Sequence, residues 1–345
     1  MQIVINDMTD RLSPASAGAL TAAKGGPRTR DQHDVCVGLV PALSQLEYQA
    51  PSNLAPVPHR LRVATWNAER CMFVPDSRAL LDQMAADVVL LTEVDLGMAR
   101  SANLHTVREL ARPTGEGYVY GVEFVETGRG SPREALLHPE LENAASFHGN
   151  AILSRLALTD CFLVRLDDGG VWYQGPSGDR ELRIGYRNAI VARIADVSPR
   201  IWVASVHLES SSDADDRARQ VRRLIACVSE RAGDDAVILG GDFNTNTLRD
   251  GSGDVAALML DVEASEPLFA VMRDSGYSWA AINTSGTTQR TRPDGDPKPP
   301  FARLDWLFCK GLVGENPATF AAVGASGVIS DHDAVLAEFM VPDQR

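Results

Sequence analysis

The chain has 345 residues, of which 44% are hydrophobic, so it can bury a sizeable core in one large domain or two small ones. Its formal net charge of −13, from 33 basic and 46 acidic residues, disfavours a broad basic face for nucleic acid but leaves room for a local basic groove. The 5 cysteines are scattered without a CxxC pair, which disfavours zinc and disulfide frameworks and indicates a reducing compartment. No apolar run approaches the roughly 18 residues of a membrane span, and the N-terminus lacks a secretory signal. We therefore expect a cytoplasmic protein and favour a monomer.

The first 60 residues are predicted to lie outside the main domain. Residues 1–32 are rich in Ala, Gly, Ser, Thr and Pro without clear periodicity, which predicts a poorly ordered segment. Residues 33–60 hold one short apolar piece followed by a proline-rich run, which indicates an arm and an extended linker. The main domain is therefore expected over residues 61–345.

The domain opens with a strand, a helix and a second strand, at 61–66, 76–86 and 88–91. Polar residues end both strands, Asn67 after the first and Glu93 after the second. Another helix is predicted at 100–111, and an irregular stretch with a short strand near 118–125 follows. Further strands are predicted at 151–154 and 162–164, and a loop at 167–180.

The second half of the chain is also predicted to alternate between strands and helices. Strands at 188–194 and 201–206 form a predicted hairpin that runs into His207, and 213–231 is the clearest amphipathic helix, with a capping-box-like start at Ser212. A buried strand at 236–239 leads into Gly240–Thr245, where Asp242 and Asn244 are one residue apart and point the same way. Short helices are expected at 254–260 and 267–275, a surface loop at 283–300, and strands at 304–308, 318–323 and 334–341.

Residues capable of catalysis recur where these strands end. A carboxylate beside an amide past a strand end suits a divalent cation and a phosphate oxygen, although an Asx-rich turn without chemistry gives the same pattern. Asp305 lies inside an apolar strand, where a bare carboxylate is costly and needs a partner; a histidine would serve, and Arg303 is the structural alternative. Several such residues in one chain favour a single site. They are Asn67, Glu93, His207, Asp242, Asn244, Asp305, Asp331 and His332.

Seven short motifs, taken in order, resemble the endonuclease/exonuclease/phosphatase superfamily, which includes deoxyribonuclease I and the exonuclease III type of abasic-site endonucleases. The motifs are Trp66-Asn67, Thr92-Glu93, Gly149–Arg155, Val206–Glu209, Gly241–Asn244, Leu304–Trp306 and Ser330–His332. They extend over residues 61–341. The resemblance implies an α/β fold, a four-layer α-β-β-α sandwich of two mixed sheets with outer helices.

The resemblance also implies roles for individual residues. A magnesium ion, for which Mn²⁺ is expected to substitute, would be held by Glu93, Asn67 and Asp331. Asp242 would orient or deprotonate the attacking water or bind metal, and His332, oriented by Asp305, would act as general acid/base or charge donor. Phosphate or substrate contacts would come from Asn244, His207 and Asn150, although Asn150 has the alternative of simply ending a loop.

The predicted function is therefore magnesium-dependent hydrolysis of a phosphoester, most readily a phosphodiester, by in-line water attack. The substrate stays open between nucleic acid and a small or lipid phosphodiester, because loops around one centre decide it. The alternatives are a DNA endonuclease or abasic-site nuclease and, in another class, an inactive binding protein with the same fold. Arg290, Arg292 and Lys298 of the predicted loop 283–300 could provide a local phosphate contact.

Overall fold

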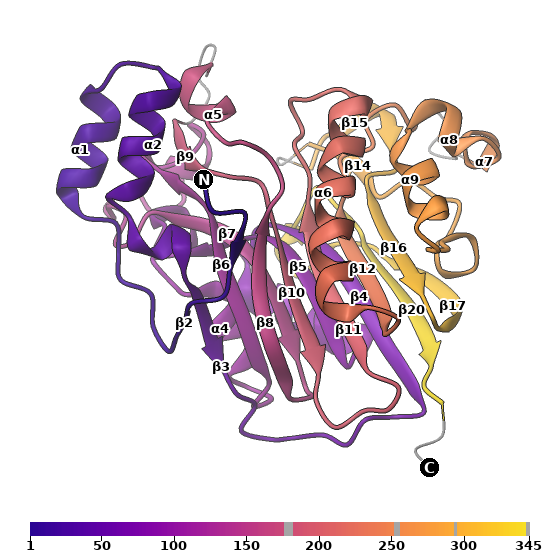
Figure 1. Cartoon of the computed structure of the whole chain (residues 1–345). Helices are drawn as coiled ribbons and strands as arrows, with labels where there is room; N and C mark the ends of the chain where they lie inside the picture. The colour runs from indigo at the N-terminus through magenta and orange to yellow at the C-terminus, as the bar shows by residue number, and fades with distance from the viewer. Residues whose placement is uncertain (176–181, 252–255, 293–294, 343–345) are drawn as a thin grey trace.

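The computed structural model describes residues 1–175, 182–251, 256–292 and 295–342. Two large mixed sheets pack face to face with helices outside, so the expected four-layer α-β-β-α sandwich is confirmed (Figure 1). The six-stranded sheet has the order β1 (Val4–Ile5), β8 (Leu158–Arg165), β10 (Asn188–Ile194), β11 (Ile201–His207), β12 (Ala236–Asp242) and β16 (Asp305–Lys310). The nine-stranded sheet has the order β17 (Val313–Phe320), β20 (Ala334–Met340), β4 (Arg60–Arg70), β5 (Val88–Leu96), β7 (Phe147–Ser154), β6 (Gly117–Glu126), β3 (Leu46–Gln49) and β2 (Met8–Thr9), with β9 (Arg183–Gly185) paired to β6.

An apolar layer between the two sheets forms the centre of the protein. Leu61, Val63 and Leu90 of the nine-stranded sheet face Ile190 and Ile238 of the six-stranded sheet within one buried cluster. The sheets approach closely at Gly240, where an added Cβ would lie 2.7 Å from Leu90 Cδ1. Gly240 and Gly241 lie within strand β12, which extends past the predicted strand end at residue 239.

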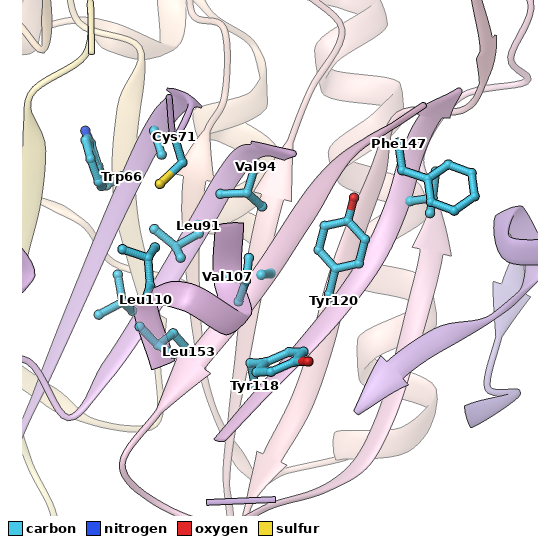
Figure 2. Packing of buried hydrophobic residues seen from close by; sticks show 14 of the residues in the cluster. Trp66, Cys71, Leu91, Val94, Val107, Leu110, Tyr118, Tyr120, Phe147 and Leu153 are labelled. Atoms are coloured by element: carbon cyan, nitrogen blue, oxygen red, sulfur yellow. The ribbon is translucent and has the colours of Figure 1, made fainter. Parts of the chain in front are cut away.

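Helices cover the outer face of each sheet. On the nine-stranded sheet, α3 (Val74–Met84) and α4 (Thr106–Ala111) contribute to a cluster in which Leu110 and Val107 lie near Leu91 and Leu153 (Figure 2). On the six-stranded sheet, α6 (Ala214–Ala232) and α9 (Leu268–Asp274) pack on aromatic residues of β16. Helix α6 is capped by Asp213, whose side chain accepts from the N–H of Asp216, rather than by Ser212.

Each sheet contains a strand–helix–strand unit with a parallel strand pair. In the nine-stranded sheet β4 pairs in parallel with β5 and α3 connects them; in the six-stranded sheet β11 pairs with β12 and α6 connects them. The polar residues Asn67 and Glu93, and His207 and Asp242, lie at or near the carboxyl ends of these strands. The fold therefore brings the strand ends of both units to one edge of the sandwich.

The expectation that residues 1–32 are poorly ordered is wrong. They form β1, β2, helix α1 (Ala17–Gly25) and the start of α2 (Arg30–Gly38), which lie together at one end of the sandwich in Figure 1. Ala19 and Ala23 are fully buried, and Ser16 and Thr29 cap the two helices. The segment packs through small side chains and backbone pairing, which leave little hydrophobic periodicity in the sequence. Residues 33–60 likewise contribute 3₁₀ helix η1 (Pro41–Ser44) and strand β3.

The predicted surface loop 283–300 is also partly regular. It contains β14 (Gln289–Thr291) and most of β15 (Pro297–Ala302), which form a three-stranded sheet with β13 (Arg249–Asp250). The predicted helix 100–111 is divided into η2 (Ala99–Ser101) and α4, because Ala102 and Asn103 have left-handed backbone, φ 55° and 57°. The predicted loop 167–180 contains α5 (Val171–Gln174), and its residues 176–180 lie outside the described residues.

The remaining elements are short. The predicted helix 254–260 is described as α7 (Ala256–Met259), with residues 254–255 outside the described part. The others are α8 (Val262–Ser265), η3 (Glu134–Leu136), η4 (Ala280–Ile282) and the pair β18 (Val323–Gly324) and β19 (Gly327–Val328). Among the described helices, none combines the length and the apolar character needed to cross a membrane.

Candidate active site

The predicted site residues gather around one cavity at the edge where β4, β5, β11 and β12 end. The cavity has a volume of about 490 Å³. Glu93, His207, Asp242, Asn244, Asp331 and His332 line it, whereas Asn67, Asp305 and Asn150 lie behind them. A larger cavity of about 910 Å³, lined by residues such as Tyr48, Arg193 and Trp202, contains none of the predicted site residues.

Asp305 and His332 form the expected pair. The Nδ1 atom of His332 lies 2.8 Å from Oδ2 of Asp305, and both side chains are buried. The Nε2 atom of His332 lies 3.9 Å from Oδ2 of Asp242 and 3.8 Å from Oδ1 of Asp331. Arg303, the alternative partner of Asp305, donates instead to the carbonyl oxygens of Thr284 and Gly286. The hydrogen bond thus fixes the ring with its other nitrogen close to two further carboxylates.

The charges around His332 favour its protonated form. Burial lowers the pKa of His332, but Asp305, Asp331 and Asp242 raise it more strongly, to about 10. Gln289 also contacts the ring, with Nε2 of Gln289 3.2 Å from Nε2 of His332 and 2.9 Å from Oδ2 of Asp331. A charged imidazole in this position can donate to an anionic oxygen.

Asp242 is held from both sheets. Its Oδ2 accepts from the side-chain amide of Asn67 at 3.0 Å, and its Oδ1 accepts from the backbone N–H of Asn244 at 2.8 Å. The Asn67 oxygen accepts from the N–H of Glu69, and the Asn244 side chain donates to the carbonyl oxygen of Leu208. In this structure the Asn67 amide therefore orients Asp242, and its role as a metal ligand stays a prediction.

Glu93 reaches the cavity through an irregularity in β5. Its backbone is left-handed, with φ 55°, at a register shift between Leu91 and Val94. Its N–H donates to Oδ1 of Asn150 at 3.3 Å, and Asn150 donates in turn to Asn188. Asn150 is fully buried, so its position supports a role in placing Glu93 and not the predicted substrate contact.

His207 lies between two carboxylates of the cavity. Its Nε2 atom is 3.8 Å from Oε1 of Glu93 and 3.8 Å from Oδ2 of Asp242. On the other side of the ring, Nδ1 lies 3.0 Å from Oε2 of Glu123, and Arg187 packs against the ring with Nη1 3.0 Å from Nε2. Glu123 thereby fixes the orientation of the ring.

A buried network of arginines and carboxylates forms one wall of the cavity. Arg100 donates to both oxygens of Asp95 at 2.8 Å and to Glu126 at 2.6 Å, and all three side chains are completely buried. We call this network the arginine cluster. It comprises Arg70, Arg100, Arg183 and Arg187 with Glu93, Asp95, Glu123, Glu126, Glu134 and Glu209.

A family model described as the Endonuclease/Exonuclease/phosphatase family matches residues 64–332. The chain belongs to this family. Its members are phosphoester hydrolases, so the activity to expect at this cavity is hydrolysis of a phosphate ester. No curated protein matches the chain in sequence.

Solved structures of the endonuclease/exonuclease/phosphatase type share the fold at low identity. A functionally unknown conserved protein from Enterococcus faecalis V583 has 17% identity and a TM-score of 0.55, over 82% of this chain and 100% of the other. An endonuclease/exonuclease/phosphatase from Bacteroides vulgatus has 14% identity and a TM-score of 0.54, over 82% and 99%. D. rerio TDP2, complexed with a single strand DNA product, has 17% identity and a TM-score of 0.50, over 81% and 98%.

The cavity of this family member has the donor chemistry of a divalent cation site. Glu93, His207 and Asp242 each offer an atom within 4.8 Å of the others. Asp331 and Glu69 lie side by side, with the N–H of Asp331 donating to Oε2 of Glu69 at 2.8 Å. Burial and the charge of Asp331 raise the pKa of Glu69 to about 8, the mark of two carboxylates that lack a full counter-charge. The residues present therefore fit a hard cation such as Mg²⁺.

Several residues of the endonuclease/exonuclease/phosphatase site were not predicted from the sequence. Glu69, Arg70 and Cys71 follow Asn67 in three consecutive left-handed conformations, with φ 42°, 72° and 53°, which turn Glu69 and Arg70 to the cavity. Glu123 carried the same signal as Asp305, an acid inside an apolar strand. Gln289 lay in a segment predicted as a loop, where nothing in its sequence distinguished it.

Proposed function

We propose that the protein is a magnesium-dependent phosphodiesterase that cleaves a P–O bond by in-line attack of water. The observation that carries the proposal is the hydrogen bond from His332 to Asp305, which directs Nε2 of His332 toward Asp242 and Asp331 at the cavity. This arrangement places a cationic donor beside a fixed carboxylate, as a reaction that develops charge on phosphate oxygens requires.

Asp242 is the proposed acceptor of the water's proton. Asn67 and the N–H of Asn244 hold its two oxygens, so its carboxylate keeps one orientation while a water attacks phosphorus. His332 then donates to a phosphoryl oxygen and stabilises the pentavalent transition state, while Asp305 retains the ring's orientation. The bond from water oxygen to phosphorus forms as the bond to the leaving oxygen breaks.

Glu93, Asp331 and Glu69 are the carboxylates we assign to the metal, with His207 and Asp242 as neighbours. A bound Mg²⁺ supplies Lewis-acid polarisation of a phosphoryl oxygen. Arg70 forms an ion pair with Glu93, and Oε1 of Glu93 faces His207. The chain itself thus supplies a cation for this carboxylate.

The test is turnover of bis-p-nitrophenyl phosphate after exhaustive chelation, followed by addition of Mg²⁺ or Mn²⁺. We expect chelation to abolish turnover and either ion to restore it. Glu93→Gln should raise the Mg²⁺ concentration for half-maximal activity by at least about tenfold. Glu140→Gln, on a side chain 66% exposed, is the matched control. Full activity after chelation would remove the metal from the proposal.

The natural substrate is to be found with a panel of single-stranded DNA, abasic duplex, plasmid, RNA and phospholipid. Single-stranded DNA is the first to test, because D. rerio TDP2 was solved with a single strand DNA product. The net charge of −13 argues against a duplex endonuclease. The alternative of an inactive binding protein predicts binding of such ligands without turnover of any. Such a protein would be expected to lack residues of the family motifs, and none of those named above is missing.

A further inference from the structure

Arginine and lysine side chains line part of the cavity. Arg70, Arg100 and Arg183 line the cavity but each forms an ion pair, with Glu93, Asp95 and Glu126 respectively. Within the described ranges of the chain, no such pair involves the two other cations that line the same cavity. These two are Arg249 and Lys298.

The backbone holds these two cations on one small sheet. Arg249 lies in β13 and Lys298 in β15, and β13 pairs with β15 through Arg249 and Ala302. Arg249 donates from Nε and Nη2 to the carbonyl and side-chain oxygens of Asn246, each at 2.7 Å. Two hydrogen bonds to one residue fix the guanidinium plane while leaving further N–H groups for a ligand.

Lys298 is connected to the proposed catalytic centre. Its Nζ atom lies 3.3 Å from Oε1 of Gln289, and the other end of that amide lies 3.2 Å from Nε2 of His332. The side-chain amide of Gln289 therefore lies directly between Lys298 and His332. By contrast Arg290, on the neighbouring strand, forms an ion pair with Asp333 and does not line this cavity.

We propose that Arg249 and Lys298 bind a second phosphate group of the substrate, next to the phosphoester that is cleaved. A phosphodiester carries a single negative charge, for which His332, oriented by Asp305, is the proposed donor. Two additional cations without counter-charge, in a chain of net charge −13, match a further phosphate, for which Arg and Lys are the usual ligands. This inference rests on the proposed phosphodiesterase function and names its substrate class, a phosphodiester flanked by another phosphate. A nucleic-acid strand and a small bisphosphorylated molecule share that chemistry.

The test compares two substrates that differ by one phosphate. They are the 5′-p-nitrophenyl ester of thymidine 5′-phosphate and the same ester carrying a 3′-phosphate. For the wild-type protein with Mg²⁺ we expect kcat/KM to be at least about tenfold higher for the 3′-phosphorylated ester. Arg249→Gln and Lys298→Gln should each reduce this ratio to within about threefold of unity. Arg112→Gln and Lys310→Gln, which remove the same charge outside the cavity, should keep the full ratio.

The possible outcomes separate this inference from the proposed function. Equal turnover of both esters by the wild type would overturn the second phosphate site and leave the phosphodiesterase intact. If neither ester is hydrolysed, the proposed function fails, and calorimetric binding of thymidine 3′,5′-bisphosphate decides the site: unchanged affinity in both cavity variants would overturn it. Oligothymidylate distinguishes the sources, because a strand-binding protein should cleave it with higher kcat/KM than the bisphosphorylated ester. Thermal melting confirms that each variant is folded.

Discussion

The two walls of the cavity both contain buried carboxylates, but they differ in the groups that hold these carboxylates. In the arginine cluster each buried carboxylate is matched by a guanidinium, as Asp95 and Glu126 are by Arg100. On the other wall, which we call the histidine cluster, the carboxylates are held by a side-chain amide, backbone N–H groups and one histidine rather than by arginines. That cluster comprises Asn67, Glu69, Asp242, Asp305, Asp331 and His332.

This difference separates a scaffold from a reactive surface. Paired ions at short distance have little remaining capacity for another ligand, and removing one member leaves an uncompensated buried charge. Carboxylates held by amides and N–H groups keep free lone pairs and a strong local field, which attract a proton or a cation. The comparison predicts that changes in the histidine cluster affect turnover, whereas changes at the fully buried Asp95, Arg100 and Glu126 of the arginine cluster affect folding.

The largest expected effect is on turnover in the histidine cluster. Asp305→Asn and His332→Ala should each lower kcat by about 10³–10⁴-fold, because the ring loses its orientation or its charge is removed. The double variant should lose little more than the worse single variant, since the two groups act as a unit. Phosphodiester turnover at saturating Mg²⁺ measures this, with the exposed Asp274→Asn as control. Losses that multiply independently would show that the two residues do not work as a pair.

Next in size is a loss of stability in the arginine cluster. Arg100→Met should lower the free energy of unfolding by about 3–5 kcal/mol, because Asp95 and Glu126 are left buried without their cation. The midpoint of urea unfolding measures the loss, and Arg112→Met, on a side chain 75% exposed, is the control. Unchanged stability combined with lost turnover would reverse the assignment of the two walls.

Acid should lower the free energy of unfolding within a defined pH window, because buried carboxylates become protonated. Burial raises the pKa of Glu126, but Arg100 and Arg183 lower it more, to about 2 from an ordinary 4.5. Outside the arginine cluster, the pKa of Glu47 is likewise lowered to about 2, against burial, by His105, the Leu12 N–H and Tyr118. Since both folded-state pKa values are depressed, their stabilisation is complete above about pH 4.5 and is lost as the pH falls toward 2.

Urea midpoints measured from pH 6 to pH 2.5 test this acid sensitivity. Glu126→Gln, which removes the titrating group, should flatten the lower part of the profile, whereas the exposed Glu140→Gln should not. A wild-type profile that stays level between pH 4.5 and pH 2.5 would contradict the depressed pKa values.

The smallest predicted effect concerns the N-terminal segment. The N–H of Leu12 donates to Glu47, and the carbonyl oxygen of Ile3 accepts from the N–H of Arg165. Removing residues 1–32 should therefore lower the free energy of unfolding by roughly 2–3 kcal/mol, about the contribution of one buried leucine. Differential scanning calorimetry of the shortened chain measures it. An unchanged melting temperature would show that the segment adds nothing to the fold.

The two walls also differ in how far the sequence revealed them. Asp305 and His332 could be paired in advance, because a carboxylate inside an apolar strand demands a partner and the motif order supplied one. Glu69 lies two residues after Asn67, close to a predicted site residue in sequence. Its place at the cavity depends on the left-handed backbone of residues 69–71, which the sequence does not predict. The arginine cluster joins β4, β5, β6, β9, η2 and η3 with Arg187, just before β10, and Glu209, just after β11. Which arginine meets which carboxylate depends on strand order rather than on local pattern.

The two parallel strand pairs have a mechanical consequence. Glu93 belongs to one sheet and His207 and Asp242 to the other, so a cation held by all three would add a further link between two layers that meet through apolar contacts and through the Asn67–Asp242 hydrogen bond. The two layers lie close together two residues before Asp242, at Gly240, where the absence of a side chain allows Leu90 to approach. Gly240→Ala would push the two sheets apart and weaken the binding of a cation by Glu93, His207 and Asp242. Cation affinity and thermal stability should therefore change in the same direction, because both depend on the contact between the two sheets at this site.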